Sequence, residues 1–181
     1  MTEQLLDRAL VEEATKKSGL IWVRGSGAPA PGAPGPEAPA QALWHVWHDG
    51  AACLVGDGPG EQPLPGLVDG GDAVVIVRSK DKGGRVVAWT AKVVELAPAS
   101  PAWEAAVAEL KGKRLNATDG EEMPARWARE CRVLRLEPQV GTLPLPDGSL
   151  AAVPLPTSAT TRRPIPAAVP RLLFKKRGRR R

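Results

Sequence analysis

The sequence lacks tyrosine and contains one phenylalanine, two cysteines and two histidines in 181 residues. Cys53 and Cys131 lie far apart, each in a short apolar run, so we expect neither a disulfide framework nor a zinc site. His45 and His48 point to opposite faces of a strand, so we expect no metal site. No apolar run reaches the roughly eighteen residues of a membrane helix, and the acidic N-terminus lacks an apolar signal core. These absences favour a protein of the reducing cytoplasm that does not contact a membrane.

An excess of positive charge is found only at the C-terminal end. The formal net charge is +5, but six basic residues fall within Lys175 to Arg181 without an acidic neighbour. The other 19 basic residues balance the 20 acidic ones. The body of the protein is therefore close to neutral, and nucleic-acid contact through Lys175 to Arg181 would be nonspecific and sensitive to salt.

Short β-rich runs dominate the part of the chain that has a regular pattern. Apolar spacing and capping residues predict a helix from Thr2 to Ser18, another from Ser100 to about Lys113, and a short one at Pro124 to Arg129. Six extended runs separate and follow these helices. They cover residues 20–24, 42–48, 51–55, 73–79, 85–95 and 131–137.

This element order predicts a mostly β fold of the α+β class, a six-stranded antiparallel split β-barrel with peripheral helices. A small barrel is favoured because closure removes exposed sheet edges. We assign residues 1–137 to this domain. Residues 25–41, rich in Pro, Ala and Gly, are expected to form a disordered insertion, and residues 138–181 a disordered Pro-rich tail ending in the basic cluster.

The most informative stretch is ALWHVWHDGAACLVGDGPGEQ, from Ala42 to Gln62. Asp49 and Gly50 lie between two apolar runs, which is the strongest short-range signal for a hairpin with a two-residue turn. The second run leads into the glycine-rich loop Gly56 to Gln62. Backbone N–H groups in such a loop can approach an anionic ligand, although a turn without any ligand has the same residue types.

The sequence of the hairpin and of the glycine-rich loop, together with the long strand VVAWTAKVVEL, resembles the pyridoxamine 5'-phosphate oxidase-like family of FMN-binding split barrels. The resemblance is greater to the small actinobacterial members of that family. The resemblance covers roughly Leu5 to Glu137. It implies a homodimer with FMN, or a deazaflavin in related members, in a groove at the interface.

The resemblance also implies a set of ligand-contacting residues. The ring system would lie beside the first hairpin strand, at Trp44, His45, Val46 and Trp47. The phosphate would be held by the loop residues Gly58, Gly60 and Gln62, with Arg78 and Lys80 of a neighbouring hairpin as cations. This chain departs from the family because Pro63 to Pro65 stand where Lys or Arg is usual, and because Asp57 and Glu61 would repel a phosphate.

No arrangement of Ser, Cys or His suggests a nucleophile with its base, and no pair of acids stands out, so we name no catalytic residue. The leading hypothesis is a flavin-binding protein and small oxidoreductase of unknown substrate, whose chemistry is that of the cofactor. A second hypothesis is a non-catalytic ligand-binding or interaction module of the same fold. A third is weak nucleic-acid association through the basic tail.

Overall fold

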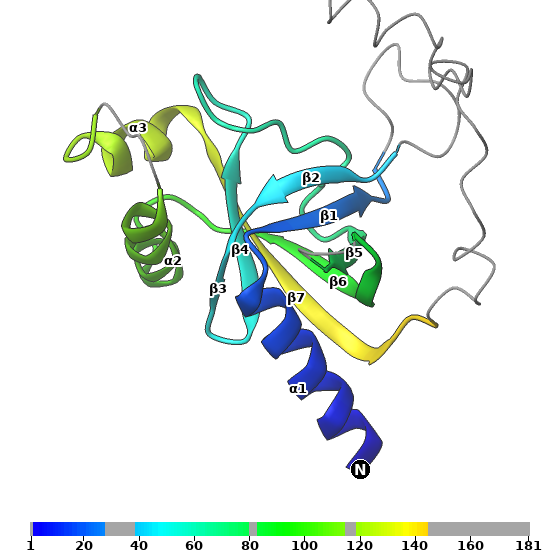
Figure 1. Cartoon of the computed structure of the whole chain (residues 1–181). Helices are drawn as coiled ribbons and strands as arrows, with labels where there is room; N and C mark the ends of the chain where they lie inside the picture. The colour runs from blue at the N-terminus through cyan, green and yellow to red at the C-terminus, as the bar shows by residue number, and fades with distance from the viewer. Residues whose placement is uncertain (1, 28–38, 80–82, 115–118, 145–181) are drawn as a thin grey trace, which may run out of the picture. The chain divides into compact units, whose positions relative to one another are not determined.

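The structure is a computed structural model that describes residues 2–27, 39–79, 83–114 and 119–144 (Figure 1). The described residues form three helices and seven strands: α1 (Thr2–Lys17), β1 (Leu20–Gly25), β2 (Gln41–Trp44), β3 (Val46–His48), β4 (Ala51–Gly56), β5 (Asp72–Arg78), β6 (Arg85–Glu95), α2 (Pro101–Lys113), α3 (Met123–Glu130) and β7 (Arg132–Thr142). The strands form one antiparallel sheet in the order β2-β1-β5-β6-β7-β4-β3. The predicted mostly β split barrel is confirmed.

A bend at His45 closes the barrel and explains the seventh strand. The sequence predicts one strand over residues 42–48, but the chain leaves β2 at Trp44 and starts β3 at Val46. Trp44 pairs with Leu20 of β1, whereas Val46 pairs with Cys53 of β4. Because β2 and β3 lie at the two ends of the sheet order, His45 joins those ends covalently. The single predicted strand is thus corrected to two short strands on either side of a bend.

The predicted two-residue turn is confirmed between β3 and β4. Asp49 and Gly50 have φ values of 46° and 75°, which is the left-handed conformation that a primed hairpin turn requires. Strand β4 is buried at every position. Its inward side chains fill the barrel, and its outward side chains lie under α2 and α3.

Two apolar clusters share the sheet. The inward residues of the strands, including Leu54, Val75 and Trp89, form the cluster inside the barrel. The outward residues of β3, β4 and β7 form a second cluster with α2 and α3, centred on Leu110 and Trp127. Helices α2 and α3 therefore cover one outer side of the barrel (Figure 1). No helix among the described residues is long and apolar enough to cross a membrane.

Strand β7 extends beyond Glu137, where the sequence predicts the end of the folded part. It continues through Pro138 to Thr142, and Thr142 pairs with Trp89 across an irregular register. Pro138 pairs with Ala91 next to this irregularity, a position in a sheet at which a residue without an N–H is tolerated. Gly25 and Gln41 belong to β1 and β2, so the predicted insertion is shorter at both ends. Residues 28–38 and 145–181, the rest of the segments predicted to be disordered, lie outside the described residues.

Helix α1 packs on the barrel through Val11 and Thr15, which are both almost completely buried. Its predicted apolar stripe is largely exposed: the exposed fractions of Leu5, Leu6 and Leu10 are 69%, 66% and 46%. The helix extends past the β3–β4 hairpin (Figure 1), and Asp7 in its N-terminal half accepts a hydrogen bond from the N–H of Thr142 in β7. An apolar helix face of this size is left without a partner within the described residues of one chain.

Gly25 gives a direct test of the packing between β1 and the segment that follows β4. A Cβ atom at Gly25 would lie 2.0 Å from the carbonyl oxygen of Gly66. Since backbone must move to relieve this overlap, we expect Gly25→Ala to lower the free energy of unfolding by about 3 kcal/mol, measured by chemical denaturation. Gly112→Ala in α2 is the control, because a Cβ there meets nothing within 4 Å, and it should stabilise by about 0.5–1 kcal/mol. Equal effects of the two variants would contradict the packing.

Candidate functional site

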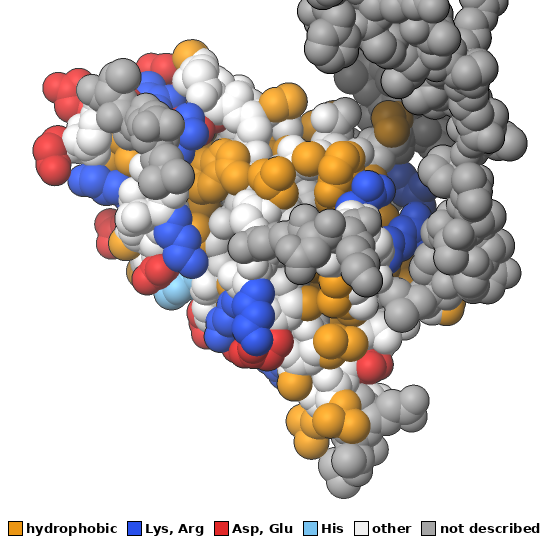
Figure 2. Space-filling model, viewed as in Figure 1, with side chains coloured by type: hydrophobic (Ala, Val, Ile, Leu, Met, Phe, Trp, Pro, Cys, Tyr) orange, Lys and Arg blue, Asp and Glu red, His pale blue; other side chains and the backbone are white. Residues whose placement is uncertain are grey.

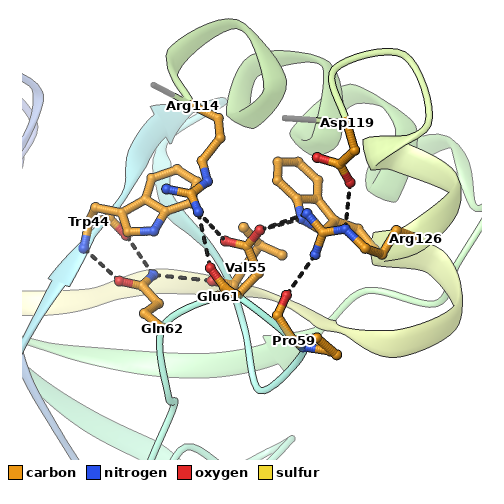
Figure 3. A network of polar contacts seen from close by, with 10 residues as sticks. Trp44, Val55, Pro59, Glu61, Gln62, Arg114, Asp119 and Arg126 are labelled. Carbon is orange, nitrogen blue, oxygen red and sulfur yellow. Dashed lines mark hydrogen bonds and ion pairs between the residues drawn. The ribbon is translucent and has the colours of Figure 1, made fainter. Parts of the chain in front are cut away.

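The glycine-rich loop after β4 is attached to α2 and α3 by a buried carboxylate. The Glu61 side chain has an exposed fraction of 0% and lies between two arginines (Figure 3). Its Oε1 atom accepts hydrogen bonds from Arg126 Nη2 at 3.1 Å and from Trp127 Nε1 at 3.0 Å. Its Oε2 atom lies 3.3 Å from Arg114 Nη2. Glu61 is therefore neutralised inside the protein and does not present a negative charge to a ligand at the loop.

Arg126 completes this network from α3. Its Nε donates to Asp119 at 2.6 Å, and its Nη1 donates to the carbonyl of Pro59 at 3.0 Å. The hydrogen bond to Arg126 lowers the pKa of Asp119. The loop is thus held by both a side chain and a backbone carbonyl, which fixes its position relative to α3.

Arg114, at the C-terminal end of α2, connects the loop to β2. Its Nη2 donates to the carbonyl of Gly60 at 3.1 Å, and its guanidinium carbon lies 5.5 Å from the centroid of the Trp44 ring. Figure 3 shows the guanidinium between the Trp44 indole and Glu61. With 28% of its side chain exposed, Arg114 remains open to solvent on one side. A cation over an indole ring is attracted by the ring's electrons.

Gln62 fixes the backbone of Trp44. Its Oε1 accepts from the Trp44 N–H at 2.8 Å, and its Nε2 donates to the Trp44 carbonyl at 2.9 Å and to that of Val55 at 3.2 Å. A side-chain amide thereby replaces the strand partner that β2 loses where the barrel splits. Little of Gln62 is free for the predicted phosphate-binding role, because both the oxygen and the nitrogen of its amide already have hydrogen-bond partners.

The remaining polar groups of the loop are also engaged within the fold. The Asp57 carboxylate accepts from the N–H of Leu64 at 2.7 Å and pairs with Arg132 at 3.1 Å. A Cβ at Gly58 would lie 2.2 Å from Cys131 Sγ, so this glycine is needed for close packing against the start of β7. Gly60 has a φ of 75°, which suits the turn. These contacts favour the turn interpretation of the loop over a backbone cradle for phosphate.

The structure separates the four residues predicted beside the ring system. Trp44 is half-buried at the outer end of β2, next to Arg114. Val46 is buried in the cluster with α2, and Trp47 packs against the barrel interior, edge-on to Trp89 at a centroid distance of 6.3 Å. The imidazole of His45 lies under α1, with Nε2 3.0 Å from the carbonyl oxygen of Thr15.

The environment of His45 favours a neutral imidazole. Burial lowers the pKa of His45 to about 4, and the positive charge of Lys113 acts in the same direction, against the hydrogen bond to Thr15. The ring's Nδ1 and the hydroxyl of Thr15 are both buried, and neither has a hydrogen-bond partner among the residues that the structure describes. His45 thus serves the attachment of α1 to the bend in the strand.

The outward side of β1, β2 and β5 carries an apolar surface that we call the outer face. Its members are half-buried or exposed, and they are Leu20, Trp22, Ala42, Trp44, Val74 and Ile76. Trp22 pairs with Ala42 on one side and with Ile76 on the other, so the surface is continuous across the three strands. Figure 2 shows hydrophobic side chains gathered over β1 and β2. Strands with apolar residues on both faces are typical of sheets covered on both sides.

Arg78 lies at the far end of this outer face, with its guanidinium carbon 4.3 Å from the centroid of the Trp22 ring. It is on β5 and is not among the groups that contact the glycine-rich loop. Lys80 lies outside the described residues, as does the basic cluster Lys175 to Arg181. Of Arg78 and Lys80, the two cations predicted to hold the phosphate, the structure describes Arg78 alone.

A separate groove of about 630 Å³ lies between α1 and β7. It is lined on one side by Leu5 and Arg8 and on the other by Arg135 and Pro138. Arg135 already donates to Glu137 and to the carbonyl of Asp49. The groove does not include Trp44 or the glycine-rich loop.

The sequence does not reveal the cation that the structure brings to Trp44. Arg114 caps the C-terminal end of α2, 54 residues from the Gly60 carbonyl that it contacts. It does not follow the glycine-rich loop in sequence, because the barrel and not the local sequence places α2 beside β2. One signal was available: basic residues in the last turn of a helix often interact with the chain that packs on that end.

Comparison with known proteins supports the fold. No family model matches the chain, and no curated protein matches its sequence. HutZ, the heme storage protein from Vibrio cholerae, has a similar structure, with a TM-score of 0.52, 11% identity, and coverage of 74% of this chain and 90% of HutZ. The conserved hypothetical protein Rv2991 from Mycobacterium tuberculosis is also similar, with a TM-score of 0.50, 11% identity, and coverage of 89% of this chain and 97% of that one.

Proposed function

We propose that this protein is a homodimeric cofactor-binding split barrel that holds a flavin, FMN in the first instance, on its outer face and acts as a small oxidoreductase. The observation that carries the proposal is the position of Trp44. This tryptophan packs against the cluster with α2 and α3, it ends the half-buried apolar surface of β1, β2 and β5, and a partly exposed arginine lies over its ring. A planar ring needs apolar surface, and its phosphate needs a cation, and both are present within a few ångströms of each other.

The residues present fit a flavin in part. Trp22 and Trp44 offer aromatic surface on the outer face, and Arg114 offers donors at its edge. The backbone of the glycine-rich loop fits less well, since the N–H groups of Asp57 and Glu61 already bond to carbonyls of the loop. When bound, a flavin supplies hydride or electron transfer. The chain's own contribution is to bind the ring, orient it and exclude water from one of its faces.

The same surface supports the proposed homodimer. A second copy seated on the outer face would cover the half-buried tryptophan Trp22 and the exposed Leu20, whose exposed fraction is 51%. The exposed leucines of α1 are a second apolar surface that such a dimer can use. Two free cysteines, one of them buried, suit a reducing compartment such as the cytoplasm.

A second candidate is a non-catalytic binding module of the same fold. It is favoured by the internal use of Asp57, Glu61 and Gln62, which leaves few groups at the loop for a cofactor phosphate. This candidate keeps the dimer and the outer face but replaces the flavin by another apolar ligand. The association of the basic tail with nucleic acid lies outside the described residues and stays a prediction.

Titration of the purified protein with FMN distinguishes the two candidates. We expect quenching of flavin fluorescence to saturate at one FMN per chain, with a dissociation constant in the micromolar range that is typical of modest cofactor sites. Haemin, riboflavin and a deazaflavin are titrated in parallel. A dimer mass in solution, with no saturable binding of any flavin, would favour the binding module and contradict the oxidoreductase.

A further inference from the structure

His45 connects the corner of the barrel to the end of α1. It forms the bend between β2 and β3, the two strands at the ends of the sheet order, and its side chain is buried. Its Nε2 lies 3.0 Å from the carbonyl oxygen of Thr15, in the last turn of α1. The last carbonyls of a helix lack a partner within the helix and need a donor from elsewhere. The imidazole supplies such a donor, so the attachment of α1 depends on the state of this ring.

The contact with Thr15 fixes which ring nitrogen carries the proton of the neutral imidazole. A carbonyl oxygen only accepts, so Nε2 donates and Nδ1 is left with a lone pair. Nδ1 is buried and has no hydrogen-bond partner in the described part of the chain. A second proton on the ring would therefore place a positive charge and an N–H donor at a position without an acceptor and without solvent, which is costly.

The charged groups of the surrounding elements do not favour a charged ring. On α1, the two lysines that follow Thr15 each pair with a glutamate one turn earlier. On α2, the positive charge of Lys113 opposes protonation of His45. On β4, burial raises the pKa of the Cys53 thiol to about 11, so this neighbour is neutral. The carboxylate of Asp49, on the hairpin turn, is paired with an arginine. Acid therefore favours an arrangement in which the ring reaches water.

Of the elements that enclose the ring, α1 is the one that can move away from it. His45 is held by a strand on either side, whereas two residues join α1 to β1. A Cβ at one of them, Gly19, would meet nothing within 4 Å, so the link is not tightly packed. Within the described part of the helix, only Val11 and Thr15 are buried. Elements with few buried contacts open at a lower free energy than the core of a protein.

We propose that His45 and Thr15 form an acid-sensitive latch: protonation of the imidazole at Nδ1 releases α1 from the barrel, while the seven strands stay paired. Release uncovers the apolar cluster inside the barrel, to which Val11 belongs, and removes one wall of the groove between α1 and β7. The protein thus has a folded acid form with additional apolar surface. This inference goes beyond the proposed function and does not depend on a bound flavin.

Hydrogen exchange of the full chain, followed by mass spectrometry from pH 6.5 to about pH 4.5, tests the latch. Protection factors, which correct for the pH dependence of the intrinsic exchange rate, are compared between peptides of α1 and of β4. Protection in α1 should be lower than in β4 and should fall about thirtyfold, since the released ring binds a proton with the ordinary pKa of 6.5 and the latched ring with a pKa of about 4. Tryptophan fluorescence should stay constant, because α1 contains no tryptophan.

Three variants separate the latch from a general weakening of the helix. His45→Gln keeps a donor for the carbonyl of Thr15 but cannot gain a charge, so protection in α1 should change by less than about threefold over this range. His48→Gln, at a half-buried position of β3, is the matched control and should keep the full acid effect. Val11→Ala weakens the attachment of α1 without changing the ring, and should lower protection in α1 about tenfold at both ends of the range.

A loss of protection that is confined to α1 in acid and disappears in His45→Gln supports the latch. Equal losses in α1 and β4, or an undiminished acid effect in His45→Gln, overturn it. If His45→Gln does not fold, the wild-type protein and Val11→Ala decide: a loss confined to α1 in both supports the latch, and a joint loss with β4 overturns it.

Discussion

Glu61→Gln should destabilise the protein by about 3 kcal/mol, as much as the backbone overlap expected for Gly25→Ala. The Glu61 carboxylate is fully buried and forms contacts with Arg114, Arg126 and the indole N–H of Trp127. A neutral amide keeps the volume but leaves two guanidinium groups without their shared counter-charge, and its N–H₂ group faces donors. Removing one partner of a buried ion pair is costly because the other charge stays desolvated.

Urea unfolding followed by tryptophan fluorescence measures this effect. The comparison variant is Glu109→Gln on an exposed position of α2, which should change the free energy of unfolding by less than about 0.5 kcal/mol. Because Glu61 holds the loop to α2 and α3, the glycine-rich loop should also become sensitive to proteolysis. Similar unfolding midpoints for Glu61→Gln and Glu109→Gln would show that the network does not hold the loop.

The stability of the protein should fall by about 3 kcal/mol between pH 6.5 and pH 4 because of His45 alone. Burial lowers the pKa of His45 to about 4 in the folded state, whereas the unfolded chain has the ordinary value of 6.5. Between these values the unfolded state binds a proton that the folded state does not bind, so acid favours unfolding. The contribution is fully present above pH 6.5, is lost as the pH falls to about 4, and is constant below that.

Unfolding free energies measured from pH 4 to 8 test this slope. His45→Gln should remove most of the difference between pH 6.5 and 4, although it should also lower stability at pH 7 by weakening the contact with Thr15. His48→Gln, at a half-buried position of β3, should keep the slope. A pH profile of His45→Gln that runs parallel to the wild-type profile would contradict the buried, neutral imidazole.

Much of the fold could be predicted from local sequence because the signals are local. Asp49 and Gly50 define a hairpin turn, Ser100 accepts from the N–H of Trp103 as an N-cap, and alternation marks β5. The bend at His45 could not be predicted in this way. No Gly or Pro within positions 42–48 marks a bend, and the strand bends at His45 because β2 and β3 pair with opposite ends of the sheet.

The candidate site was predicted in part for the same reason. Trp44 and the loop are close in sequence and were found together, whereas Arg114 reaches Gly60 from 54 residues away. From the sequence, Asp57 and Glu61 are expected to repel a phosphate from the loop. Sequence alone could not show that Arg114, Arg126 and Arg132 neutralise them, since these partners come from α2, α3 and β7.

A crystal structure of the protein soaked with FMN tests the central claim most directly. The account predicts ring density against Trp44 on the outer face, with the phosphate within hydrogen-bond distance of Arg114 and a second chain covering Trp22. Density for FMN in the groove between α1 and β7, with the outer face bare, would contradict it.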